Sequence, residues 1–76
     1  MSKTLAMIRR DAGYSTQAAF SSVLGLRRTQ IAKWETGNRY PRPIMLPRIA
    51  AVLHVTEGEV IAAITAAKHS TVDASL

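Results

Sequence analysis

The 76-residue sequence predicts an all-α fold, in which five short helices form one compact domain. Apolar residues recur every three or four positions instead of alternating, which is typical of helices with one buried face. Glycines follow several of these segments, where a left-handed residue can end a helix, and threonines precede others as N-caps. The chain contains no cysteine, so helix packing must stabilise the fold without a disulfide or a thiolate metal site.

The first two helices are bounded by capping residues. The first is expected at about residues 3–12, because Gly13 can adopt the left-handed conformation that ends a helix. The second begins after Thr16, whose hydroxyl can cap it, and ends at Gly25. The expected apolar positions are Leu5, Ile8 and Ala12 in the first helix and Ala19, Phe20, Val23 and Leu24 in the second.

The third helix follows after one tight turn and is expected at about Arg28 to Thr36, with Gly37 at its end. Leu26 is expected to fill the turn from the core side. Ile31 and Trp34 fall on the inward face, so we interpret Trp34 as a core residue and not as a stacking platform for a base.

A loop is predicted from Asn38 to Pro43, because Pro41 and Pro43 each lack a backbone donor and favour extended geometry in the preceding residue. Helix four is expected from Leu46 or Pro47 to Leu53, since proline is tolerated in a first turn. The residues just before it can form an additional turn.

Helix five is predicted by a capping box. Thr56 and Glu59 can satisfy each other's backbone amides, so the helix should begin at Glu57. We expect the domain to comprise residues 1–68 and helix five to fade at its end, leaving residues 69–76 as a flexible C-terminal tail.

Positive charge is concentrated between Arg27 and Arg48. This segment holds six arginine or lysine residues and one carboxylate, a surplus of five that equals the net charge of +5 of the whole chain. The remaining charges cancel. A one-sided block of this kind favours a polyanionic partner over a merely solvated surface.

Helix three has two distinct faces at helical spacing. One side carries Arg28, Thr29, Ala32, Lys33 and Thr36, and the other carries Ile31, Trp34 and Glu35. Two helices joined by a tight glycine turn, with polar side chains outward on the second, form a helix-turn-helix. Such a second helix fits a major groove about 12 Å wide.

An ordered set of residues extends this motif over roughly Leu5 to Ile64. It comprises Arg10, Gln17, Gly25, Leu26, Ile31, Trp34, Glu35, Gly37, the basic loop at 38–43, the segment 46–53 and Val55. With these residues in this order, the chain resembles the Cro and repressor DNA-binding domains of lambda-like phages. The resemblance implies a compact five-helix repressor-like domain, with the helix-turn-helix in helices two and three, that binds double-stranded operator DNA as a dimer.

The resemblance also implies roles for individual residues. The expected base-reading residues are Arg28, Thr29 and Lys33, flanked by Arg27 and Gln30, which can reach bases or phosphates. The expected phosphate contacts are Gln17 with Thr16 beside it, Asn38, Arg39, Tyr40 and Arg42, and Tyr40 can alternatively lie on a partner subunit. Arg10 and Glu35 match a structural ion pair between helices one and three.

Arg27 departs from the family pattern, which often has serine or threonine at the cap of helix three. Arginine cannot accept the amide hydrogen bond there, at a cost of about 1 kcal/mol in helix stability. Ser21 stands where alanine is usual, a change too small to alter the fold.

No enzymatic site is predicted. The sequence offers no nucleophile with a base and orienting group, no phosphate-binding glycine loop and no paired carboxylates. His54 and His69 lack companions at metal-ligand spacing, so neither a metal nor a cofactor is expected. The N-terminal segment resembles neither a signal peptide nor a membrane span, and we expect a cytoplasmic protein with no membrane partner.

Apolar residues around much of helix five indicate a homodimer surface near this helix and the stretch Pro43 to Met45, although alanine is also simply a good helix former. Two alternatives to a Cro-like regulator stay open: an antitoxin that also binds a toxin, and a protein-interaction module without DNA binding. A contact with RNA polymerase is compatible with a Cro-like regulator. The sequence leaves the operator, the sign of regulation, the host and any effector undetermined.

Overall fold

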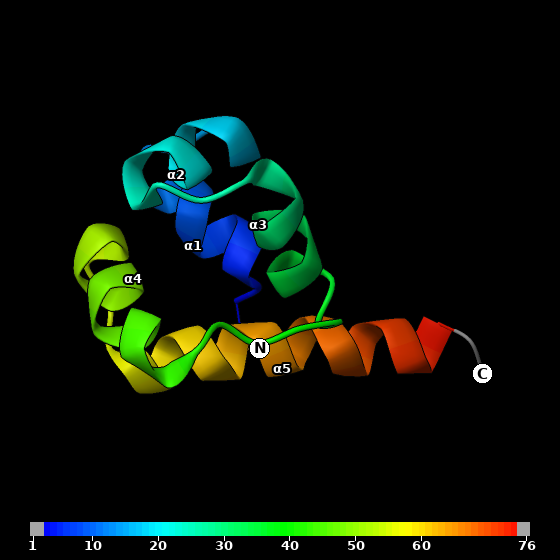
Figure 1. Cartoon of the computed structure of the whole chain (residues 1–76). Helices are drawn as coiled ribbons and strands as arrows, with labels where there is room; N and C mark the ends of the chain where they lie inside the picture. Colours follow the sequence, from blue (N-terminus) through cyan, green and yellow to red (C-terminus); the bar gives the residue numbers. More distant parts are fainter. Residues whose placement is uncertain (1–2, 75–76) are drawn as a thin grey trace.

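A computed structural model describes the backbone of residues 3–74 and the side chains of residues 3–68. These residues form five α-helices and one short 3-10 helix, with no strand among them, which confirms the predicted all-α fold (Figure 1). The elements in order are α1 (Leu5–Asp11), α2 (Gln17–Leu24), α3 (Arg28–Glu35), η1 (Pro43–Met45), α4 (Leu46–Leu53) and α5 (Glu57–Ala74).

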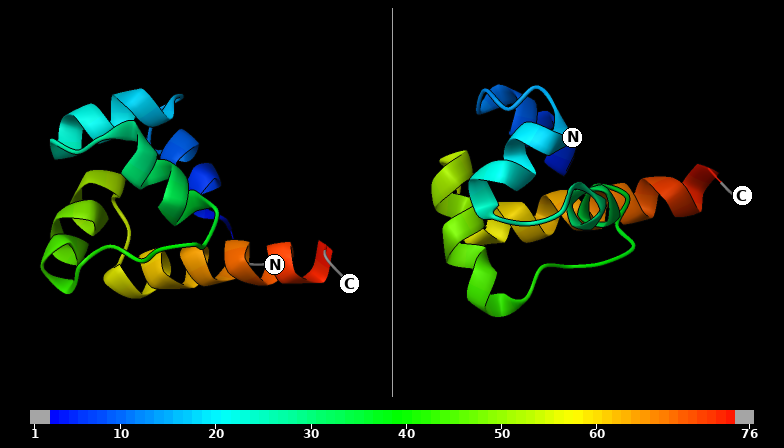
Figure 2. Two further views of the ribbon diagram at one scale, coloured as in Figure 1. Left: turned by 45° about the vertical axis from the view of Figure 1, so that its right-hand side comes forward. Right: turned by 45° about the horizontal axis from the view of Figure 1, so that its top comes forward.

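The longest helix, α5, is the base on which the other helices are assembled. α1, α3 and α4 all contact it, while α2 packs mainly against α3. The segment between α3 and η1 crosses in front of α5 in Figure 1, and the right-hand view of Figure 2 shows it as an open arc beside that helix. The carboxyl end of α5 projects beyond the other helices in every view.

Most helix ends follow the predicted caps. The Thr16 hydroxyl accepts a hydrogen bond from the backbone amide of Ala19 at 3.1 Å, and Gly25 ends α2 with a φ of 71°. The capping box before α5 forms, since the Thr56 hydroxyl accepts from the Glu59 amide at 3.1 Å and the Glu59 carboxylate accepts from the Thr56 amide at 3.3 Å. These local interactions stop and start the helices where sequence reasoning expected.

The predicted end of the last helix is wrong. We expected helix five to fade near Lys68, but α5 continues to Ala74. No glycine or proline lies between Lys68 and Ala74, so nothing interrupts the backbone hydrogen bonds, and weak helix formers cost only a few tenths of a kcal/mol each. Of the predicted tail, residues 75–76 lie outside the described part of the chain.

The core lies between the five α-helices. Phe20 and Trp34 are buried, as predicted, and pack with apolar residues of every α-helix. The predicted apolar face of α2 is only partly correct, because Ala19 and Val23 are exposed. Ser21 is buried instead and satisfies its hydroxyl by donating to the Ala18 carbonyl at 3.0 Å.

Candidate nucleic-acid interface

α3 presents a continuous polar face to solvent. Arg28, Thr29 and Lys33, the three expected base-reading residues, are all exposed. On the opposite side Ile31 is fully buried and Trp34 is 6% exposed, so the helix is fixed against the core by its apolar face. The polar face is therefore carried on a firm support, as entry into a groove requires.

The start of α3 lacks the usual side-chain cap. Arg27 occupies the N-cap position and makes no capping hydrogen bond with its side chain. The side-chain carbonyl of Gln30 accepts from the Arg27 backbone amide at 3.0 Å and closes the first turn from the other side. The NH₂ group of Gln30 therefore remains available as a hydrogen-bond donor. The exposed Arg27 guanidinium takes no part in the cap.

The predicted ion pair between Arg10 and Glu35 is wrong in its arginine. Arg10 is exposed, whereas Arg9 is 3% exposed and its Nε lies 2.7 Å from Glu35 Oε2. The signal was present in the sequence, because Arg9 lies four residues after Leu5 and so shares its buried face of α1. Matching by resemblance placed the pair one residue too far along the chain.

The ion pair extends by hydrogen bonds to the exposed face of α3. Arg9 also donates to the Tyr14 carbonyl at 2.7 Å, and the second carboxylate oxygen of Glu35 accepts from Gln17 Nε2 at 2.9 Å. The Gln17 carbonyl oxygen in turn accepts from Arg28 at 3.1 Å. Because Glu35 accepts the NH₂ end of the Gln17 amide, the oxygen end faces Arg28.

Gln17 thus joins the first turn of α2 to both ends of α3. This side chain braces α3 through its contacts with Glu35 and Arg28. Its expected phosphate contact stays a prediction. Thr16 beside it uses its hydroxyl oxygen as the cap of α2 and keeps the O–H as a donor.

A cleft separates α3 from the loop that follows it. Its volume is about 740 Å³, and it is lined by Leu26, Gln30, Lys33, Trp34, Arg39, Tyr40, Pro41, Arg42, Ile44 and Met45. Three of these residues are cations, and no carboxylate lines the cleft. Lys33 from the helix and Arg39 and Arg42 from the loop are therefore brought together by the fold, although they are separated in the sequence. Asn38 is also exposed, at the start of this loop.

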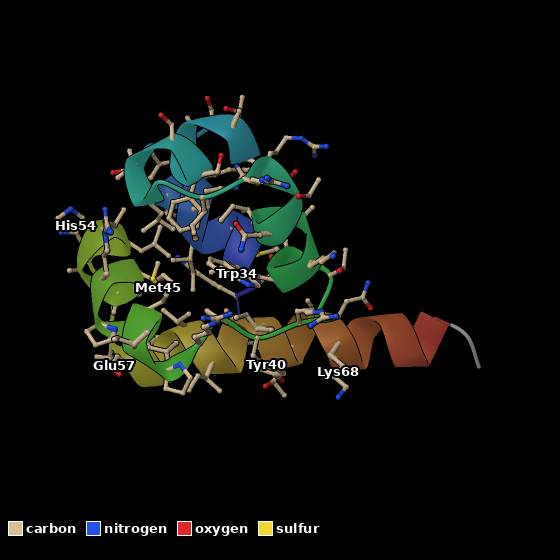
Figure 3. The ribbon with its side chains drawn as sticks, in the orientation of Figure 1. Trp34, Tyr40, Met45, His54, Glu57 and Lys68 are labelled. Atoms are coloured by element: carbon tan, nitrogen blue, oxygen red, sulfur yellow. The ribbon has the colours of Figure 1, made fainter. Side chains whose placement is uncertain are left out.

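Tyr40 differs from the other expected phosphate contacts. Its hydroxyl lies 2.7 Å from the Thr65 hydroxyl on α5, and the residue is 44% exposed (Figure 3). The side chain thus holds the loop against α5, a role that the sequence did not reveal. Neither residue carries a local signal of pairing, because they are 25 positions apart.

The described residues contain no group of three or more histidine, cysteine or acidic side chains that could hold a metal ion. Among the same residues, no single helix is long and apolar enough to cross a membrane. The segments Pro43–Leu53 and Glu57–Lys68 reach the required hydropathy only as a pair, bent by 98°. Both contribute buried side chains to the core, including Ile49, Leu53 and Val60.

A family model described as helix-turn-helix matches residues 5–60, which is well over half of the chain. The match covers α1 to α4 and the start of α5, and therefore includes the polar face of α3 and the loop after it. No curated protein and no solved structure matches the chain.

Proposed function

Since this chain belongs to the helix-turn-helix family, whose members bind DNA to regulate transcription, we propose that it is a Cro-like or repressor-like regulator that binds a palindromic operator as a homodimer. The observation that carries the proposal is the exposed face of α3. Arg28, Thr29 and Lys33 point away from a core that fixes the helix through Ile31 and Trp34. The proposal includes no enzymatic activity, cofactor or metal.

In this proposal the contacts divide into two kinds. Arg28, Thr29 and Lys33 read base edges in the major groove, with guanine under an arginine or lysine because its O6 and N7 accept from these side chains. Gln17, Asn38, Arg39 and Arg42 contact the sugar-phosphate backbone and set the register. The cleft between α3 and the loop supports this division, since it gathers cations from both elements without a carboxylate.

The homodimer is supported by exposed apolar side chains on two neighbouring elements. Ile44 on η1 is 83% exposed and Ile61 on α5 is 41% exposed, and both elements contact α4. A symmetric dimer would place one α3 in each half-site, about 34 Å apart on one face of the DNA. We further propose that the protein acts in the bacterial cytoplasm and represses by blocking RNA polymerase.

Selection of bound duplexes from a random pool tests the proposal directly. We expect an inverted repeat with guanine in each half, and affinity that falls steeply between about 50 and 200 mM salt. Lys33→Ala should reduce discrimination between duplexes, while Arg42→Ala should weaken all duplexes alike. Weak binding with little salt dependence would favour the interaction module without DNA binding. Co-purification of a second small protein would favour the antitoxin.

A further inference from the structure

Between Arg39 and Arg42 the loop is held in place by side chains and not by backbone hydrogen bonds. In the described part of the chain, Tyr40 and Arg42 donate no backbone hydrogen bond, and Pro41 and Pro43 have no N–H to donate. The last backbone bonds before this stretch are those of Asn38 and Arg39 to the Lys33 carbonyl, at 3.0 and 3.3 Å. The backbone amide of Arg39 thus bonds to α3, and the Arg42 carbonyl accepts from the Met45 amide of η1 at 2.8 Å, so it is the stretch between the two arginines that depends on other contacts of the loop.

The loop contacts α5 at two places. Gly37 lies so close to the helix that a Cβ atom on it would be 2.7 Å from the Lys68 Cα. Pro41 is buried, and the Tyr40 hydroxyl is hydrogen-bonded to Thr65 at 2.7 Å. Figure 3 shows Tyr40 and Lys68 along the same side of α5. The loop is thus seated on α5 at its start and at Tyr40, directly between the two arginines.

We propose that Thr65 is a positioning residue for DNA binding. Through its hydrogen bond to the Tyr40 hydroxyl, it holds Arg39 and Arg42 where their side chains can contact DNA phosphates. The inference rests on the proposed function, because it assigns these arginines to phosphate contacts. Thr65 itself touches no DNA. Its contribution is to spare the loop the entropic cost of becoming ordered when DNA binds.

Thr65→Val removes the hydroxyl at nearly constant volume, and Tyr40→Phe removes its partner. Either change should weaken binding to every duplex by about three- to tenfold, which is the range expected for one hydrogen bond. The double variant should lose no more affinity than either single variant, because both changes remove the same hydrogen bond. The slope of log affinity against log salt should become shallower, since fewer phosphates are neutralised. Thr65→Ser should restore binding, and Ser22→Ala, an exposed hydroxyl on α2, is the matched control.

The decisive comparison uses a variant with Arg39→Ala and Arg42→Ala. If Thr65 acts through these arginines, Thr65→Val should have no further effect on affinity in that background. An equal loss in both backgrounds would overturn the inference, as would wild-type affinity and salt slope in Thr65→Val. Thermal unfolding of each variant separates these outcomes from loss of the fold.

A measurement without DNA keeps this inference distinct from the proposed function. Trypsin can cut the bond between Arg39 and Tyr40, whereas the bond after Arg42 is protected by Pro43. Cleavage at Arg39 should be at least about threefold faster in Thr65→Val than in wild type, because the loop opens more often. Unchanged cleavage would refute the anchoring role. Faster cleavage in a protein that binds no duplex would leave the anchor standing and refute the proposed function.

Discussion

Arg9 and Glu35 show how one buried pair serves both stability and the exposed polar face of α3. Their side chains are 4% and 8% exposed, so each charge depends on the other and on its hydrogen bonds to remain in the interior. Glu35 also accepts a hydrogen bond from Gln17, and Gln17 accepts one from Arg28. A chain of hydrogen bonds therefore connects the exposed Arg28 on α3 to the buried Arg9 on α1. The structural pair and Arg28, a proposed DNA contact, are therefore not independent here.

Arg9→Met should destabilise the protein by about 3 kcal/mol or more, because it leaves the Glu35 carboxylate buried without its cation. Arg10→Met is the matched control, since Arg10 is exposed and its loss should change stability by less than about 0.5 kcal/mol. Urea unfolding followed by circular dichroism measures both. A larger loss for Arg10 than for Arg9 would restore the ion pair expected from family resemblance.

At the scale of helices, the sequence predicted the ends that carry a capping residue and missed the end of α5. Threonine caps at Thr16 and Thr56 act within four residues, so local chemistry decides them without any tertiary contact. The end of α5 has no such signal. We inferred a tail from polar composition, but polar residues do not stop a helix in the absence of glycine or proline. Contacts between distant positions, such as Tyr40 with Thr65, are equally invisible to local patterns.

The two glycines that flank α3 should respond differently to substitution. Gly25→Ala should cost about 1 kcal/mol, because φ is 71° but a Cβ there meets nothing within 4 Å. Gly37→Ala should cost at least about 2 kcal/mol more, since its Cβ would lie 2.6 Å from the Lys68 Cβ and would push the loop off α5. Denaturant midpoints for the two variants provide the comparison, and equal losses would contradict the close packing of Gly37 on α5.

The junction between α4 and α5 contains a strained position. His54 caps α4 in the left-handed conformation with a φ of 58°, which only glycine adopts without cost. His54→Gly should therefore stabilise the protein by about 0.5 kcal/mol, the relief of strain less the added entropy of the unfolded chain. His54→Ala retains the strained backbone and should give no gain. An equal gain in both variants, measured by thermal unfolding, would assign the effect to the imidazole instead.

For the molecule as a whole, the sequence predicted the exposed polar face of α3 more completely than the contacts that surround it. Spacing alone placed Arg28, Thr29 and Lys33 outward and Trp34 inward, since a helix obeys a fixed period. The convergence of Lys33 with Arg39 and Arg42 around one cleft, and the support of the loop by α5, depend on how the chain folds back on itself. Such convergence follows from tertiary packing, which periodicity does not encode.

The proposed dimer makes a prediction at this scale, because neither Ile44, which also lines the cleft beside α3, nor Ile61 is among the proposed DNA contacts. Ile44→Gln and Ile61→Gln remove exposed apolar side chains without altering charge, so the salt dependence contributed by phosphate contacts should be unchanged. We expect these variants to bind an isolated half-site as wild type does. For the complete inverted repeat they should lose at least about tenfold in affinity, because a dimer that is bound at one half-site raises the effective concentration of its second subunit at the other.

Met7→Gln on α1 is the control, since Met7 is 50% exposed on a helix outside the proposed surface. Sedimentation and titration of half-site and full-site duplexes distinguish the outcomes. If the Ile44 and Ile61 variants bind the full site as wild type does, while Met7→Gln weakens it, the subunits associate through the α1 face instead.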